Sequence, residues 1–176
     1  LKYIDQLFNE SKIKQRKILT ANDYLRMPEI ENPFLVESII PTNGITAITG
    51  DSGKGKSLFT LFILKSLCKG EKLFNKFKTV KTKILLVDLE MSENEMVRRI
   101  HSVIIEQCSD NDDLLIMQDK EWKIDNDEDY SWITEYIISN KIGLIVIDTL
   151  SSAHRTDENS ATAMSGINSK FLQLID

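Results

Sequence analysis

Residues 50–57 carry the residue types of a phosphate-binding loop. They read Gly-Asp-Ser-Gly-Lys-Gly-Lys-Ser, which satisfies the pattern of a glycine, four residues, a second glycine, a lysine and a serine. Glycines let the backbone curl so that successive N–H groups point inward and form a nest for an anion. Lys56 is placed to reach the β- and γ-phosphates of a nucleoside triphosphate, and the Ser57 hydroxyl is placed to ligate Mg²⁺. We therefore predict a site for ATP and Mg²⁺ formed by Gly50, Asp51, Ser52, Gly53, Lys54, Gly55, Lys56, Ser57 and Leu58.

Two carboxylates follow apolar runs that should be strands. Asp148 ends the run 144–147, and Glu90 lies just beyond the run 84–88. We expect Asp148 to hold the Mg²⁺ shell through water, although an Asp that caps a turn is the alternative. We expect Glu90 to act as the general base that polarises the attacking water. Asp88 is the competing candidate for the base. A third alternative is that neither carboxylate acts as the base.

The elements around these residues alternate between strands and helices. A β-branched run at 45–49 leads into the loop, and a helical pattern at 56–69 follows it and ends at Gly70. Further strands are expected at 84–88, 114–117 and 144–147, and further helices at 92–108, at 130–139 and from Ser160 onward. Ser92 and Glu95 predict a capping box, and the acidic stretch 125–129 predicts a solvated loop. This order predicts an α/β fold with a mostly parallel sheet and helices on both faces.

The composition excludes some partners. The 176 residues include 41% hydrophobic residues and carry a formal net charge of −5. No global positive field therefore favours nucleic-acid binding. No apolar stretch is long enough to span a bilayer, and we expect a cytoplasmic protein that makes no membrane contact. Cys68 and Cys108 are expected to be buried free thiols.

The first 33 residues have a different residue pattern from the rest of the chain. Residues 1–27 read as helical, and Thr20 is a candidate cap for a short helix before Pro28. We expect 1–33 to be a helical extension or linker and 34–176 to be the ATPase domain. The linker either straps onto an adjacent subunit or packs on its own core. The chain stops inside a helical pattern, and we expect a core that is truncated at its C-terminus.

Five pieces of sequence carry a family resemblance. They are residues 34–41, 70–74, 84–90 with Arg98 and Arg99, 144–150, and 157–159. In this order and spacing the chain resembles the RecA-like ATPases of the RepA branch, a group of plasmid- and phage-type replicative DNA helicases related to the DnaB and KaiC groups. The resemblance implies a RecA-like core that forms rings, often hexamers, with ATP between neighbouring subunits. It also implies that Glu90 is the catalytic glutamate and that Asp148 is the acidic residue of the second nucleotide motif.

The resemblance also implies a contact with single-stranded DNA. Residues 151–160 match a loop that faces the central channel, which makes His154 and Arg155 candidates for phosphate contact. A loop that merely connects two elements is the alternative. The chain lacks the family's next strand and the later region that supplies an arginine finger, so we expect weak ATPase activity from this piece alone. We expect Arg98 and Arg99 to lie on the exposed face of a helix.

Other functions compete with a replicative helicase of a plasmid, virus or mobile element. A KaiC-like or recombination-accessory ATPase, whose nucleotide state switches a partner surface, is the second hypothesis. A small-molecule kinase is disfavoured because no basic lid follows the later helices. A GTPase is disfavoured because Gly143 stands where the guanine-reading aspartate belongs. The lysines of the helix at 56–69 and of the connector after it form a basic side track for DNA or simply solvate the surface: Lys65, Lys69, Lys72, Lys76, Lys78, Lys81 and Lys83.

Overall fold

The computed structural model describes residues 18–29, 33–104, 109–157 and 160–175. Contacts divide the chain into two units, Leu1–Glu31 and Asn32–Asp176. In the first unit, helix α2 (Ala21–Leu25) begins at Thr20 with a capping box, because Thr20 Oγ1 accepts from Asp23 N and the Asp23 carboxylate accepts from Thr20 N. The predicted Thr20 cap is confirmed. The earlier helix predicted in this region lies outside the described residues, as does Cys108.

The second unit contains the sheet and its helices. Its elements in chain order are β1 (Phe34–Val36), β2 (Ile40–Pro41), α3 (Lys56–Lys69), β3 (Ile84–Asp88), α4 (Glu93–Val103), the 3₁₀ helix η1 (Ser109–Asp113), β4 (Leu114–Gln118), α5 (Asp127–Asn140), β5 (Leu144–Asp148) and α6 (Ala161–Gln173). Strands β1 and β2 form an antiparallel pair. The main sheet has the order β4-β3-β5, and both of its strand pairs are parallel.

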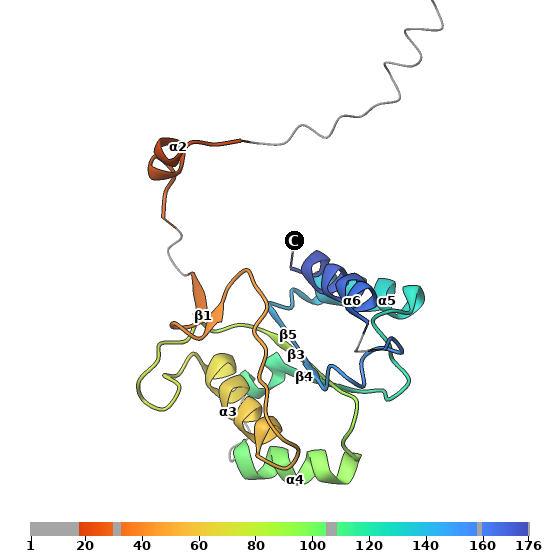
Figure 1. The fold of residues 1–176 in the computed structure, drawn as a ribbon. Helices are drawn as coiled ribbons and strands as arrows, with labels where there is room; N and C mark the ends of the chain where they lie inside the picture. The colour runs from red at the N-terminus through yellow and green to blue at the C-terminus, as the bar shows by residue number, and fades with distance from the viewer. Residues whose placement is uncertain (1–17, 30–32, 105–108, 158–159, 176) are drawn as a thin grey trace, which may run out of the picture. The chain divides into compact units, whose positions relative to one another are not determined.

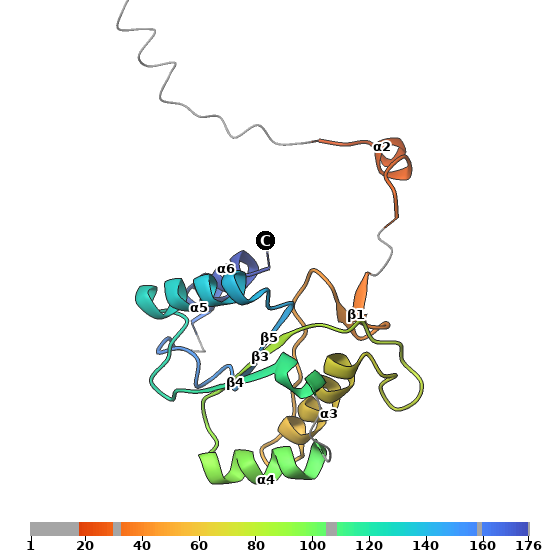
Figure 2. The same cartoon turned by 180° about the vertical axis from the view of Figure 1, so that it is seen from behind.

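Helices cover both faces of this sheet, as Figures 1 and 2 show from opposite sides. Successive side chains of a strand point to opposite faces. Ile84 and Leu86 of β3 therefore pack in a core with buried residues of α3 and α4, whereas Leu85 and Val87 pack with Ile133 of α5 and with residues of α6. All five residues of β3 are buried, as expected for the central strand. The predicted α/β fold with a parallel sheet is confirmed.

Helix α3 has the bounds that the sequence predicts. It begins after Gly55 and ends at Gly70, and both glycines have left-handed backbone conformations with φ of 81° and 67°. Gly70 N–H donates to the carbonyls of Leu67 and Ser66, which satisfies the end of the helix. Cys68 is buried in this helix.

The capping box predicted for α4 forms only in part. The Ser92 hydroxyl accepts from Glu95 N at 3.3 Å, as predicted. The Glu95 carboxylate does not reach back to Ser92. It accepts instead from Arg99 one helical turn further on, at 2.7 Å, in an ion pair between positions i and i+4.

Two further expectations were wrong. Residues 45–49 form no strand, and Ile45 and Ile48 are exposed. β-branched residues favour a strand only where a neighbouring strand accepts their backbone hydrogen bonds, and none of the described strands pairs with this segment. Residues 127–129 of the acidic stretch belong to the first turn of α5, where Asn126 accepts from the N–H groups of Glu128 and Asp129. Carboxylates are favourable at this positive end of a helix.

None of the helices among the described residues combines the length and the apolar character needed to cross a bilayer.

Candidate active site

A cavity of about 400 Å³ lies at the start of α3, beside the carboxyl ends of β3 and β5. The predicted phosphate-binding loop and α3 contribute six of its lining residues: Ser52, Gly53, Gly55, Lys56, Ser57 and Leu58. Segments far away in the sequence contribute the others: Asp88, Glu90, Met91, Arg99, Asp148 and Thr149. The fold thus brings Lys56, Ser57, Glu90 and Asp148 to one place. Gly50, Asp51 and Lys54 do not line the cavity.

The start of α3 is open to an anion. Gly55 is the residue before the helix, and no side chain caps the N–H groups of the first turn. Such N–H groups have no partner within a helix and carry the positive end of its dipole. Gly53 and Gly55 have φ of 74° and 81°, which a residue with a Cβ adopts only at a cost. These two glycines therefore allow the turn that aims the end of the helix at the cavity.

The Lys56 side chain folds over its own loop. Its ammonium donates to the carbonyl oxygens of Gly50 at 2.7 Å and Asp51 at 2.8 Å. Gly50 and Asp51 thereby act on the cavity through Lys56. The positive charge stands at the mouth of the loop, where the uncapped end of α3 also favours a phosphate.

Two carboxylates stand next to each other at the ends of neighbouring strands. Asp88 of β3 is the register partner of Asp148 of β5. Asp88 is only 1% exposed, and both of its oxygens accept hydrogen bonds. Oδ1 accepts from the N–H groups of Glu90 and Met91, each at 3.2 Å, and Oδ2 accepts from Gln118 Nε2 at 2.8 Å. The Asp88 carboxylate is thus committed to shaping the turn after β3, and this turn leaves Glu90 exposed to solvent.

The Glu90 carboxylate is held by hydroxyl groups from the loop after β5. Oε1 accepts from Thr149 Oγ1 at 2.6 Å and from Ser152 Oγ at 3.0 Å. Among the described residues, no hydrogen bond involves its Oε2. Thr149 and Ser152 were missed in the sequence. The signal was a hydroxyl-rich segment directly after Asp148.

Arg99 was also missed as a residue of this site. It lines the cavity and forms the ion pair with Glu95, whereas Arg98 is exposed. The expectation of an exposed face is correct for Arg98 and wrong for Arg99. Helix α4 begins directly after the β3 turn, so one of its faces meets the cavity. The spacing of four residues between Glu95 and Arg99 was the available signal.

His154 and Arg155 do not line the cavity. Arg155 is exposed, whereas His154 is only 6% exposed. The His154 side chain is therefore buried in this structure, and its contact with DNA stays a prediction. The backbone of this loop is tied inward, because Ala153 O accepts from Ile124 N at 2.8 Å and Asp125 Oδ2 accepts from Arg155 N at 3.0 Å.

Two lysines of the predicted side track have partners on the protein. Lys65 Nζ donates to the carbonyl of Val103 at 2.9 Å. Lys81 pairs with Asp110 at 2.6 Å, and the hydrogen bond from Asp110 raises the pKa of Lys81. The side chains of these two lysines thus bind groups of the protein's own surface. The role of the other lysines stays a prediction.

The ligand set suits Mg²⁺ better than a metal held by protein alone. Among the described residues, no group of three or more His, Cys, Asp or Glu side chains could hold a metal ion. Mg²⁺ is usually held by one or two protein oxygens together with waters and substrate phosphates. The Ser57 hydroxyl and the Asp148 carboxylate, which line one cavity, fit this requirement.

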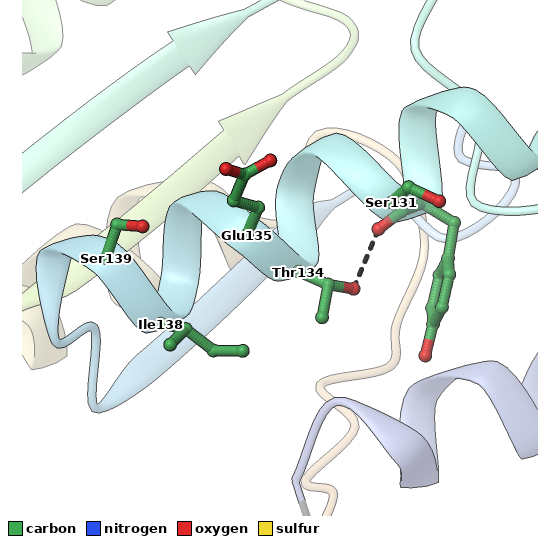
Figure 3. A pocket seen from close by; sticks show the side chains of 6 residues that line it. Ser131, Thr134, Glu135, Ile138 and Ser139 are labelled. Atoms are coloured by element: carbon green, nitrogen blue, oxygen red, sulfur yellow. Dashed lines mark hydrogen bonds between the residues drawn. The ribbon is translucent and has the colours of Figure 1, made fainter.

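A second hollow, also of about 400 Å³, lies along α5 (Figure 3). Its lining side chains all come from this helix: Tyr130, Ser131, Thr134, Glu135, Ile138 and Ser139. The Thr134 hydroxyl donates to the carbonyl of Tyr130 at 2.7 Å, which is a bond within the helix. The hollow brings together no cation and no pair of acids, so we assign it no chemistry.

Comparison with known proteins agrees with the geometry. A family model described as an AAA domain matches residues 9–175, which is nearly the whole chain. No match is found among the curated proteins. The family consists of P-loop ATPases related to RecA-like helicases. With its glycine-rich loop opening a helix beside a parallel sheet, this chain belongs to the AAA domain family of P-loop ATPases.

Proposed function

We propose that this domain binds ATP with Mg²⁺ in the cavity beside β3 and β5 and hydrolyses it with Glu90 as the general base. The observation that carries the proposal is the meeting of Lys56, Ser57, Glu90 and Asp148 around one cavity. These residues come from three separate segments of the chain. A cation, a hydroxyl and two carboxylates are the groups that phosphoryl transfer to water requires.

The loop and α3 hold the triphosphate in this proposal. The Lys56 ammonium and the uncapped N–H groups of α3 attract the β- and γ-phosphates. Ser57 supplies a hydroxyl ligand for Mg²⁺, and Asp148 accepts hydrogen bonds from its water shell. Mg²⁺, when bound, neutralises charge on the phosphate oxygens.

Glu90 activates the water. Its carboxylate accepts a proton while the water oxygen attacks the γ-phosphorus. The bond between that phosphorus and the bridging oxygen breaks, and its electron pair leaves with ADP. Asp88 is a poor rival for this role because its two oxygens already accept three hydrogen bonds.

We further propose that the full-length protein is a RecA-like motor that forms a ring, such as a hexamer, around single-stranded DNA. The support is the resemblance to RepA-type replicative helicases, together with the family match. Arg155 is exposed on the loop after β5 and is the side chain that we expect to meet a DNA phosphate. A plasmid, virus or mobile element is the expected source of such a motor.

One observation favours a second candidate, a nucleotide-gated ATPase that switches a partner surface. The loop after β5 is tied inward at Ala153 and Arg155, and the His154 ring is buried. A loop in this state offers little to DNA but would respond to the nucleotide site through Thr149. ATP turnover that is indifferent to DNA supports this candidate.

The test is ATP hydrolysis by the full chain with Mg²⁺, in the presence and absence of single-stranded DNA. Lys56→Ala should abolish nucleotide binding or turnover, and Lys120→Ala, an exposed lysine outside the cavity, is the matched control. Glu90→Gln should retain nucleotide affinity and lose turnover by a factor of about 10² or more, with Glu93→Gln as its control. Normal turnover by Glu90→Gln refutes the assignment of the base. Stimulation by DNA favours the motor.

A further inference from the structure

The side chain of Glu90 is held at an exposed position. An exposed glutamate ordinarily samples many rotamers, because three of its bonds rotate freely. Here the Asp88 carboxylate fixes the backbone of Glu90, and two hydroxyl groups from another segment bind Oε1 at 2.6 and 3.0 Å. A base that works on a water molecule must be kept within a fraction of an ångström of its productive position.

The Thr149 hydroxyl lies at the centre of a cluster of hydroxyl groups. Its Oγ1 donates to Glu90 Oε1 and lies 3.0 Å from Ser151 Oγ and 3.3 Å from Ser152 Oγ. Thr149 directly follows Asp148, and both of these residues line the cavity. The end of β5 therefore delivers two groups to the site, namely the carboxylate expected at the metal and the hydroxyl that holds the base.

We propose that Thr149, assisted by Ser152, is a positioning residue that holds Glu90 in the orientation required for attack on ATP. Both hydroxyls bind the same carboxylate oxygen, so Oε2 is left to accept the proton of the water. This inference rests on the proposed role of Glu90 and assigns a function to the loop after β5 that is independent of DNA.

The first test compares two substitutions at Thr149 in the full chain. Thr149→Val removes the hydroxyl and keeps the branched shape, whereas Thr149→Ser keeps the hydroxyl. We expect kcat for ATP to fall on the order of tenfold in Thr149→Val, with KM and nucleotide affinity nearly unchanged, and to recover in Thr149→Ser. Ser152→Ala should show a smaller fall. Thr134→Val, which removes a hydroxyl bound within α5, is the control that should leave kcat unchanged.

The second test separates positioning from a structural role. In a Glu90→Gln background, Thr149→Val should cause no further fall in kcat, because Thr149 acts through the Glu90 carboxylate. A further fall in kcat as large as the one in the wild-type background would overturn the proposal. An unchanged or higher kcat in Thr149→Val would also overturn it, because the hydroxyls would then restrain the base instead of positioning it. Equal thermal midpoints of the variants show that each folds. If the Glu90→Gln variant alone hydrolyses ATP at the normal rate, the assignment of Glu90 as the base has failed, and the proposed role of Thr149 fails with it.

Discussion

Replacing Asp88 with alanine separates its structural role from a chemical one. The substitution leaves the N–H groups of Glu90 and Met91 without their acceptor, and it leaves the Gln118 amide with only the Met91 carbonyl, at 3.4 Å. A hydrogen bond to a charged group contributes about 1.5–3 kcal/mol where its partner stays buried. Glu90 and Gln118 are exposed and regain water, so about 1 kcal/mol for each bond is the appropriate scale. We expect Asp88→Ala to lower the free energy of unfolding by about 3 kcal/mol.

The assay is urea unfolding of wild type and Asp88→Ala, with Asp112→Ala, an exposed carboxylate on η1, as the control. For a domain of this size, a loss of about 3 kcal/mol lowers the thermal midpoint by roughly 6–12 °C. We expect ATP turnover to fall only in part, and only because the turn that carries Glu90 becomes less ordered. An Asp88→Ala variant with unchanged stability and no turnover would refute this reasoning, because Asp88 would then be the base.

Two further predictions concern Arg99 and Cys68. Arg99→Ala removes a cation that lines the cavity, so ATP affinity measured by titration should fall up to about fivefold, which corresponds to about 1 kcal/mol. The exposed Arg98→Ala should not change the affinity, and equal effects of the two variants would contradict the placement of Arg99. Burial raises the pKa of the Cys68 thiol from 9.0 to about 11. The unfolded chain therefore ionises first, and the stability that this thiol contributes is complete below pH 9 and is lost as the pH rises toward 11. Unfolding in urea at pH 7 and pH 10.5 should show a loss of about 2 kcal/mol that Cys68→Ala lacks, and equal losses in both proteins would contradict it.

The local elements could be predicted well because their signals lie within a few residues. Strand β3 and helix α3 have the predicted bounds, since a continuous apolar run and a helix between two glycines leave little choice. The segment 45–49 could not be predicted correctly. Its β-branched residues have strand propensity, but propensity does not supply the neighbouring strand that its N–H and C=O groups require.

Among the residues that line the cavity, those of the loop and of the strand ends could be predicted from the sequence, whereas Arg99 and Thr149 were missed. The loop and the ends of β3 and β5 were found because parallel strands deliver their carboxyl ends to one edge of the sheet. The sequence left Glu90, Asp88 or neither open as the base, and the assignment to Glu90 stays a prediction. Only the structure shows that Asp88 is buried and accepts three hydrogen bonds. Burial also separates His154 from Arg155, although the two residues are adjacent in the sequence.

The sequence by itself determined that this chain would turn a glycine-rich loop into the start of a helix, because the turn needs only local backbone freedom and the dipole of the helix that follows. It also determined which strand ends carry carboxylates. Only the tertiary structure decided which side chains meet those carboxylates. Hydrogen bonds and ion pairs act over a few ångströms, and the hydroxyl of Thr149 reaches Glu90 only after β3 and β5 have paired.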